Sequence, residues 1–171
     1  TNILRALSAS GAVAGTISGM SWGNNNRGQL GLGNTTNYSS PVMIGEKDTW
    51  SKVGRGYATA IALKSDGTMW TWGNNNNGQL GQGDSPVQVG ALTTWLKPIM
   101  GYGSTFSTKT DGTLWAWGNN NSGQLGLGDK INRSSPVQVG SLTTWSMVGA
   151  GQYFGMAIKT DGTLWCWGNN S

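Results

Sequence analysis

The sequence predicts an all-β protein built from β-propeller blades, each a sheet of about four short antiparallel strands. Three observations predict this fold class. A signature that begins Trp-Gly-Asn-Asn recurs at Trp22, Trp72, Trp117 and Trp167, with spacings of 50, 45 and 50 residues. Between the signatures, apolar residues alternate with a period of two, as they do in strands. No stretch of the 171 residues shows the periodicity of a helix.

Each unit opens at an isolated tryptophan and continues through two strands joined by a tight turn. The isolated tryptophans are Trp50, Trp95 and Trp145. In residues 50–94, the pair Asp66-Gly67 is the kind that accepts the positive φ angles of a hairpin turn. Trp70 and Trp72 follow and share one face of the next strand, because they are two residues apart.

The signature itself predicts a turn that the fold requires rather than a ligand-binding loop, since it is nearly identical in every unit. Gly and Asn tolerate left-handed backbone geometry, and Asn side chains can cap the amides of their own loop. The Ser-Pro-Val segment after it predicts a short strand headed by a proline, a position that needs no ladder donor. These prolines are Pro41, Pro86 and Pro136.

The repeated large apolar residues are predicted to fill the space between neighbouring blades. A single sheet cannot bury both of its faces, whereas stacked sheets cover one another. Burying each Trp or Leu side chain contributes roughly 1.5–3 kcal/mol. The predicted structural core consists of Trp70, Trp72, Trp115, Trp117, Trp165, Trp167, Leu80 and Leu125.

The repeat register predicts one partial β-propeller with a divergent first repeat, two full repeats and the first half of another. Their bounds are 1–49, 50–94, 95–144 and 145–171. In this register Thr1 corresponds to Ser51, and Thr16-Ile17 replaces the Asp-Gly turn. The two ends carry the same half of a unit and do not complement each other. We therefore expect an arc completed by further repeats of a longer chain or by neighbouring copies.

Composition argues against catalysis and against metal or cofactor binding. The chain has no His, which excludes His-based triads and ligand clusters. Glu46 and Asp48 are the only close acidic pair, and their exposed loop would not raise a carboxyl pKa. Calcium takes about 6–8 oxygen ligands, whereas each turn offers one carboxylate. The single Cys166 stands where Thr71 and Ala116 stand in other units, as a small packing residue does. No catalytic, cofactor-binding or metal residue is predicted.

Charge and hydropathy argue against nucleic-acid binding and against a membrane span. The formal charge is +4, and the 11 Lys and Arg residues are scattered singly, which argues against nucleic-acid binding. No run approaches about 18 consecutive apolar residues, so no membrane span is predicted.

In its DGTxWxWGNNxxGQLGxG runs and the SPVxVG segments that follow them, the chain resembles the regulator of chromosome condensation repeat family. The resemblance covers about residues 21–171 and implies a β-propeller, usually seven-bladed, of which this chain would hold roughly half. The sequence motifs KTDGTLW and WGNN look like those of the bacterial and bacteriophage members of this family. The family often has a His before the Asp-Gly turn, where this chain has Thr59, Ser104 and Phe154.

The resemblance also implies nucleotide exchange on a small nuclear GTPase, performed by a wedge inserted between strands of the propeller. The unit spacings of 50, 45 and 50 residues leave no room for such an insertion, which argues against exchange activity by these repeats.

Binding through surface loops is the function that remains, since rigid scaffolds present function on variable connections. Aromatic residues and Arg anchor many protein interfaces, and Tyr also serves as packing between blades. The candidate partner-binding residues are Arg55, Tyr57, Tyr102, Gln152, Tyr153 and Phe154.

We hypothesise a non-enzymatic protein-binding or structural module of a bacteriophage virion (tail, fibre or capsid-associated) or a bacterial surface protein. Its partner would be a protein or a cell-surface ligand met outside the cell. The alternatives are an intracellular regulator of a GTPase or chromatin factor, which keeps a cytoplasmic location open, and an enzyme-inhibiting propeller.

Overall fold

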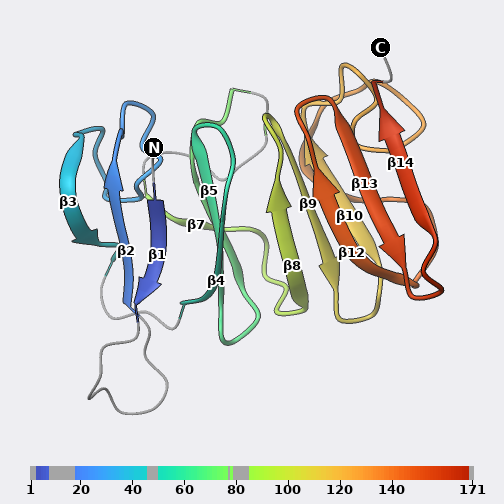
Figure 1. Cartoon of the computed structure of the whole chain (residues 1–171), viewed down its shortest axis with the longest axis horizontal. Coiled ribbons are helices and arrows are strands. Elements are labelled where there is room, and N and C mark those ends of the chain that lie inside the picture. Colours follow the sequence, from blue (N-terminus) through green and yellow to red (C-terminus); the bar gives the residue numbers. More distant parts are fainter. Residues whose placement is uncertain (1–2, 8–17, 46–49, 77, 79–84, 170–171) are drawn as a thin grey trace. The chain divides into compact units, whose positions relative to one another are not determined.

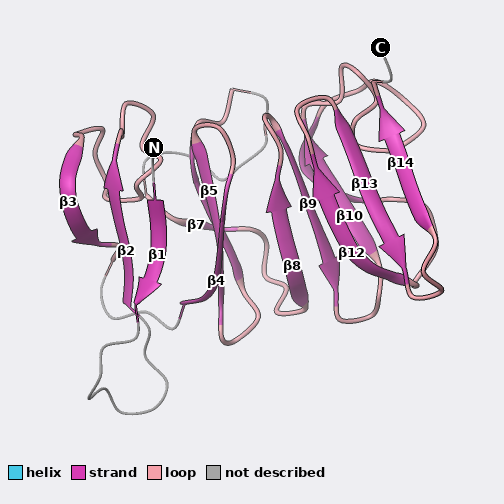
Figure 2. Ribbon diagram, viewed as in Figure 1, coloured by secondary structure: helices cyan, strands magenta, loops and turns pink. Residues whose placement is uncertain are grey.

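The secondary structure consists of strands joined by turns (Figure 1, Figure 2). The computed structural model describes residues 18–45, 50–76, 78 and 85–169, together with the backbone of residues 3–7. Within these residues there is no helix, and so none that is long and apolar enough to cross a membrane. The all-β class predicted from the sequence is confirmed.

The described strands form four antiparallel sheets, which divide between two compact units. In the first unit, sheet 1 has the order β1-β2-β3 and sheet 2 the order β4-β5-β6-β7. In the second unit, sheet 3 has the order β11-β10-β9-β8 and sheet 4 the order β12-β13-β14. Neighbours in the sequence are neighbours in each sheet, so every sheet is a meander. The strands are β1 (Ile3–Leu7), β2 (Ser18–Gly23), β3 (Tyr38–Met43), β4 (Trp50–Arg55), β5 (Thr59–Lys64), β6 (Met69–Gly73), β7 (Val87–Gln88), β8 (Trp95–Met100), β9 (Ser104–Lys109), β10 (Leu114–Gly118), β11 (Arg133–Gln138), β12 (Trp145–Ala150), β13 (Phe154–Lys159) and β14 (Leu164–Gly168).

Sheet 1 departs from the register that the sequence predicts. In the repeat register, residue 3 corresponds to a residue of β4, the strand that begins a unit. In the structure Ile3 pairs with Trp22 of β2, and the matching Trp72 of β6 pairs with Ala60 of β5. β1 therefore stands where β5 stands in sheet 2, because strand pairing rather than residue count decides the neighbour of β2. Thr1 and Thr16-Ile17, named in that prediction, lie outside the described residues.

The Asp-Gly turn is tight in sheets 2, 3 and 4, but only its glycine has a positive φ. In sheet 3 this is Gly112, with φ of 79°, and no described residue other than glycine adopts a positive φ. The prediction that the pair shares such angles is therefore wrong for the aspartate. Asp111 Oδ1 instead accepts hydrogen bonds from the backbone N of Thr113 at 3.0 Å and from its Oγ1 at 2.6 Å. The carboxylate thus fixes the turn through its side chain.

The signature turn of the second unit packs against a neighbouring sheet, and the contacts there explain why the turn recurs. Asn120 is buried, and its Oδ1 accepts a hydrogen bond from Leu125 N at 2.9 Å. Trp167 of sheet 4 lies against this turn and donates from Nε1 to Gln124 O at 2.7 Å. Gly126 has φ of 71°, and a Cβ there would lie 2.9 Å from the Trp167 ring. The turn of one sheet is therefore shaped to receive the tryptophan of the next.

The first unit repeats this arrangement between its own two sheets. Trp72 of sheet 2 donates from Nε1 to Gln29 O, in the turn after β2, at 3.1 Å. Asn25 Oδ1 accepts from Leu30 N at 2.8 Å, as Asn120 does in the second unit. One buried hydrophobic cluster of this unit contains Ile44, Trp50, Ala60, Ala62 and Trp72. One of the second unit contains Phe106, Leu114, Ala116, Leu125, Val139, Trp145, Val148 and Ala157.

The residues predicted as core have different surroundings in the structure. Trp72, Trp117 and Leu125 are buried, whereas Trp70, Trp115 and Trp167 are partly buried. Leu80 lies outside the described residues.

Trp165 does not belong to a buried core, because 50 % of its surface is exposed. Its counterparts Trp70 and Trp115 lie opposite Gln88 of β7 and Gln138 of β11. β14, by contrast, pairs only with β13 among the described strands. Among the described residues, therefore, Trp165 has no paired strand at the position where Gln88 and Gln138 lie opposite the equivalent tryptophans.

Candidate functional site

The candidate partner-binding residues lie on or beside three short loops, each of which joins the first strand of a sheet to the second. The loops are 56–58 between β4 and β5, 101–103 between β8 and β9, and 151–153 between β12 and β13. A backbone hydrogen bond spans each loop, from the N–H of the loop's first residue to the carbonyl oxygen of the residue three positions later. These bonds run from Gly56 N to Thr59 O at 3.0 Å, from Gly101 N to Ser104 O at 2.8 Å and from Gly151 N to Phe154 O at 2.9 Å.

An asparagine of the signature fixes each loop from its other side. In the second unit Asn119 N donates to Gly103 O at 2.7 Å, and Asn169 N donates to Tyr153 O at 2.9 Å. In the first unit Asn74 N donates to Ala58 O at 2.9 Å. The side chains of these loops therefore stand on a backbone that is ordered before any partner binds, which lowers the entropic cost of binding.

In the second unit, four candidate residues form one exposed surface, which we call the aromatic loop surface. It consists of Tyr102, Gln152, Tyr153 and Phe154, whose aromatic members are exposed by 47 %, 45 % and 40 % in that order. The two loops that carry them are neighbours, since a Cβ built on Gly101 would lie 2.4 Å from the carbonyl oxygen of Gly151. Gln152 Nε2 donates a hydrogen bond to the Tyr153 hydroxyl at 2.9 Å.

The remaining candidates, Arg55 and Tyr57, belong to the first unit. Arg55 ends β4 and is exposed, and Tyr57 exposes 75 % of its surface at the tip of the loop. Tyr57 holds the position in its turn that Tyr102 holds in the second unit. The first unit thus also carries an exposed aromatic side chain, Tyr57, at the tip of a loop like the one that carries Tyr102.

The chemistry of the aromatic loop surface is that of flat rings with hydrogen-bonding groups at their edges. None of its four side chains carries a charge. Among the residues that the structure describes, no three His, Cys, Asp or Glu side chains gather into a group that could hold a metal ion. Rings of this kind bury a large area with few rotatable bonds, which suits them to contacts with other proteins.

The acidic turn residues are held in their ionised form by local hydrogen bonds. The Thr113 side chain and backbone hold the pKa of Asp111 below its ordinary value, and Thr163 does the same for the pKa of Asp161. A lowered pKa is the opposite of what a carboxyl needs to act as a general acid near neutral pH. These aspartates therefore stabilise the turns.

A cluster that the sequence analysis missed recurs in three sheets: a lysine lying over two indole rings. Lys109 Nζ lies 3.4 Å from the ring centroid of Trp115 and 4.8 Å from that of Trp95. The two rings meet edge to face, with centroids 6.2 Å apart. Burial lowers the pKa of Lys109. Lys64 and Lys159 occupy the same place in sheets 2 and 4.

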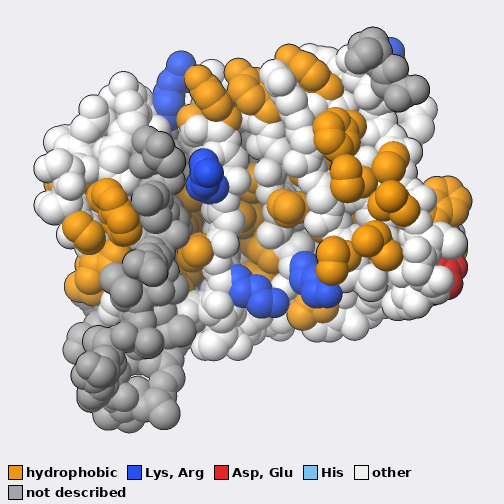
Figure 3. Space-filling model, in the orientation of Figure 1, with side chains coloured by type: hydrophobic (Ala, Val, Ile, Leu, Met, Phe, Trp, Pro, Cys, Tyr) orange, Lys and Arg blue, Asp and Glu red, His pale blue; other side chains and the backbone are white. Residues whose placement is uncertain are grey.

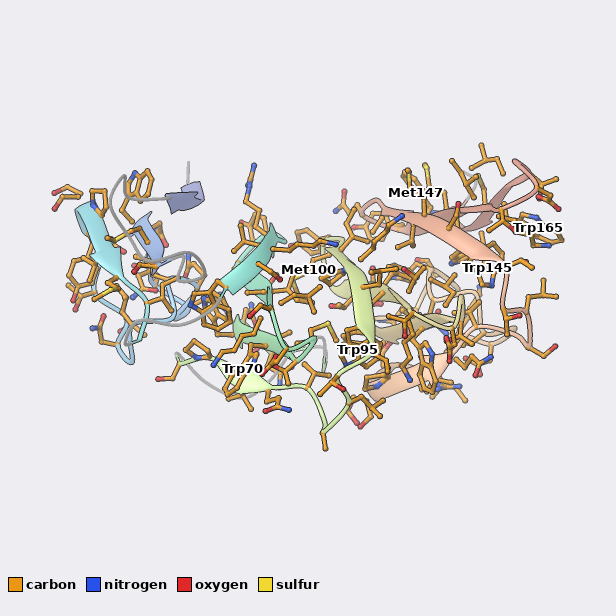
Figure 4. All side chains as sticks on the ribbon, turned by 90° about the horizontal axis from the view of Figure 1, so that it is seen from below. Trp70, Trp95, Met100, Trp145, Met147 and Trp165 are labelled. Atoms are coloured by element: carbon orange, nitrogen blue, oxygen red, sulfur yellow. The ribbon has the colours of Figure 1, made fainter. Side chains whose placement is uncertain are left out.

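The sequence carried the signal for this cluster. Each lysine stands two residues before an Asp-Gly pair and 14 residues after an isolated tryptophan. Both rings belong to the lysine's own sheet, so the cluster stabilises the sheet by cation–π attraction. In Figure 4, Trp145 and Trp165 lie together in sheet 4, on the side of β12 opposite to Met147.

Profiles of known families match most of the chain. The one described as "Regulator of chromosome condensation (RCC1) repeat" matches residues 21–63, 66–98 and 111–158. A second profile with the same description matches residues 50–79 and 148–171. No curated protein sequence gives a significant match.

Solved structures show the same fold at low sequence identity. Human WBSCR16 is 23 % identical with a TM-score of 0.77, over 91 % of this chain and 44 % of that chain. Prp20p from Saccharomyces cerevisiae, described with its binding to Gsp1p and histones, is 19 % identical with a TM-score of 0.75, over 97 % and 46 %. Yeast RCC1 (Prp20) bound by Kap60 is 16 % identical with a TM-score of 0.75, over 98 % and 47 %. The β-propeller class predicted from the sequence is confirmed, and the chain spans less than half the length of these proteins.

Proposed function

This chain belongs to the regulator of chromosome condensation (RCC1) repeat family, and from that premise we propose that it is a non-enzymatic protein-binding module. Its contact surface in the second unit is the aromatic loop surface. One observation carries the proposal: three aromatic side chains, each 40–47 % exposed, stand on two neighbouring loops whose backbones are hydrogen-bonded on both sides.

The physical case is that exposed rings on a rigid frame favour association. Aromatic side chains dominate the binding energy of many protein interfaces, because they remove a large apolar area from water. The turns are already ordered, so little conformational entropy is lost on binding. Since the four side chains are uncharged, the affinity should change little with salt concentration.

The class of partner is supported by the proteins that share the fold. Prp20p is described with Gsp1p, histones and Kap60, all of which are proteins. We carry over only this class, because identities of 16–23 % show the fold alone.

The setting we propose is a bacteriophage virion or a bacterial cell surface, where the module would contact a protein or a cell-surface ligand outside the cell. Two features of the sequence support it. The repeat sequences resemble those of bacterial and bacteriophage members of the family. Only 18 of the 171 residues are charged, and the chain is rich in Gly, Asn and Thr. Mass spectrometry of purified particles and of surface fractions tests this setting, and recovery only from the soluble cell interior would contradict it.

A second candidate is an intracellular regulator of a GTPase or chromatin factor. The observation in its favour is the fold shared with Prp20p, which is described with Gsp1p and histones. The even unit spacings, which leave no room for an inserted wedge, argue against nucleotide exchange by these repeats. Nucleotide release from a purified small GTPase, measured with and without the chain, separates the two candidates.

Photo-crosslinking tests the proposed contact surface directly. A benzophenone amino acid is placed at Tyr102 or at Tyr153, and the control position is Ile131, which lies in the same unit and is 63 % exposed. We expect one protein to be captured from both aromatic positions and not from the control. Capture from Ile131 alone, or of different proteins at Tyr102 and Tyr153, would contradict a shared surface.

The affinity for the captured protein then measures how much the rings contribute. Replacing Tyr102 and Tyr153 together by Ala should weaken binding at least about tenfold, since interface aromatics commonly contribute that much. Ile131→Ala should change it less than about twofold. Both variants should keep the thermal melt of the parent, because the replaced side chains are exposed.

A further inference from the structure

The tip of each loop between the first two strands of a sheet is exposed, whichever sheet carries it. Tyr57, Tyr102 and Gln152 hold this position in sheets 2, 3 and 4, and all three are exposed. Their exposure therefore belongs to this type of loop. None of the three side chains is charged. Figure 3 shows side chains of the hydrophobic class, which includes Tyr, above β8 and β12, the strands that lead into the two loops of the second unit.

Carbonyl groups beneath the aromatic loop surface already hold hydrogen bonds within the chain. Gly103 O and Tyr153 O accept from the backbone of the signature asparagines, at 2.7 Å and 2.9 Å. Ser104 O and Phe154 O accept from the first residue of each loop, at 2.8 Å and 2.9 Å. A partner therefore meets four carbonyl oxygens that are engaged before it arrives.

The signature turn beside the 101–103 loop likewise uses its side-chain oxygens internally. Asn119, whose backbone N–H holds that loop, accepts through Oδ1 from Asn121 N at 2.9 Å and from Gln124 Nε2 at 3.0 Å. Gln124 Oε1 accepts from Ser122 N at 2.8 Å. These amide oxygens shape the turn, so they add no new acceptor for a partner at the loop.

The hydroxyl of Tyr153, by contrast, is oriented as a donor. Gln152 Nε2 donates a hydrogen bond to this oxygen at 2.9 Å. A phenolic hydroxyl carries one hydrogen and accepts through its lone pairs. Because the oxygen accepts from Gln152, its own hydrogen points away from that amide and is available to a partner. The surface thus combines exposed rings with a directed donor at a ring edge.

We propose, building on the protein-binding function proposed above, that the aromatic loop surface binds a proline-rich segment of its partner in the polyproline II conformation. Proline has no backbone N–H, and this conformation leaves its carbonyl groups without internal partners. Such a segment brings acceptors for the Tyr153 donor and few donors that need acceptors in return. Its rings pack on tyrosine rings, and its stiffness keeps the entropic cost of binding low. A neutral glycan fits less well, because its hydroxyl groups also need acceptors.

Titration of the whole ¹⁵N-labelled chain with a capped decaproline peptide, followed by two-dimensional NMR, measures this binding. The largest shift changes are expected at the amides of the 101–103 and 151–153 loops. A Gly-Ser peptide of the same length is the matched control, since it is uncharged but flexible, and it should bind at least about tenfold more weakly. Equal binding of the two peptides, or binding of maltohexaose but not of decaproline, would overturn the proposal.

Two substitutions separate the contribution of the donor from that of the rings. Tyr153→Phe keeps the ring and removes the hydroxyl, so it should weaken decaproline binding about two- to tenfold. Tyr102→Ala removes a ring and should weaken it at least about fivefold. Ile131→Ala is the control and should leave the affinity unchanged, since this exposed residue is not part of the surface. A Tyr153→Phe chain that binds decaproline as tightly as the parent would contradict the role of the donor.

Competition distinguishes a failure of this inference from a failure of the protein-binding function. Decaproline at a saturating concentration should displace the protein that is captured by crosslinking at positions 102 and 153. A captured protein that decaproline leaves bound would overturn the proline-rich contact and leave the protein-binding function intact. If neither position captures a protein, the protein-binding function fails, and this inference fails with it.

Discussion

Sheets 3 and 4 contain the same seven residues, Lys-Thr-Asp-Gly-Thr-Leu-Trp, at 109–115 and 159–165, in two different environments. The local structure is the same in both. Trp115 Nε1 donates to Thr113 Oγ1 at 2.8 Å, and Trp165 Nε1 donates to Thr163 Oγ1 at 3.2 Å. The lysine that begins each segment lies over the tryptophan that ends it, at 3.4 Å and 3.9 Å from the ring centroid.

Burial differs between the two segments, most of all at their Leu residues. Leu114 is 0 % exposed and Leu164 is 61 % exposed, although each is flanked by the same neighbours in the sequence. Leu114 packs in a core that includes residues of sheet 4, whereas no such cluster of described residues includes Leu164. The comparison shows that these seven residues encode their turn, hydrogen bonds and ring contacts, while their burial depends on the neighbouring sheet.

Leucine truncation should separate the two environments by the largest amount. Leu114→Ala removes a fully buried side chain and should destabilise the chain by about 2–5 kcal/mol. Leu164→Ala removes an exposed one and should cost less than about 1 kcal/mol. Urea unfolding of both variants measures the difference. Equal losses would show that Leu164 is buried in solution.

The glycines of the two Asp-Gly turns form a second matched pair, with an intermediate effect. Gly112 and Gly162 have φ of 79° and 85°, so alanine is strained at both, by about 1–2 kcal/mol. A Cβ at Gly112 would lie 2.0 Å from Thr143 O, in the loop that leads to sheet 4, whereas a Cβ at Gly162 meets nothing within 4 Å. Gly112→Ala should therefore cost about 1–3 kcal/mol more than Gly162→Ala. Thermal melts of the two variants measure their losses of stability. Identical losses would mean that backbone strain alone destabilises Gly112→Ala.

The aspartates of these turns should behave alike and give the smallest effect, because their surroundings are local. The hydrogen bonds from Thr113 and Thr163 hold the pKa of Asp111 and Asp161 below the ordinary value of 3.8. A lowered pKa in the folded chain contributes stability above pH 3.8, and this contribution is lost as the pH falls through the folded pKa. Carboxyl NMR titrations should show Thr113→Val and Thr163→Val raising the two pKa values to a similar extent. A response at only one turn would show that the neighbouring sheet also sets the pKa.

Patterns that a single strand can encode were predictable from the sequence. The alternation, the proline-headed strands and the capping asparagines are local, and Asn25 and Asn120 cap their turns as expected. The sign of φ at the aspartates was mispredicted, because the carboxylate bonds to Thr rather than following its glycine. The sequence showed that each lysine has a fixed spacing from an isolated tryptophan. Only the fold showed that the lysine lies over two tryptophan rings.

Features that depend on a neighbouring strand or sheet were not predictable. Trp165 has the same preceding sequence as Trp115 but is 50 % exposed, since no described strand pairs with the outer edge of β14. The pairing of β1 likewise follows from contacts with β2 that the residue count does not reveal. Of the candidate site, the sequence predicted the residues, whereas the adjacency of the 101–103 and 151–153 loops came from the fold.

Hydrogen exchange of the two matching strands tests most directly whether their surroundings in the fold, and not their sequence, make the difference. Peptides covering β10 (Leu114–Gly118) and β14 (Leu164–Gly168) are compared by mass spectrometry in the monomeric chain. β10 pairs on both sides and should exchange at least about tenfold more slowly than β14, which pairs with β13 alone among the described strands. Equal protection of the two strands would contradict the contrast between the two environments.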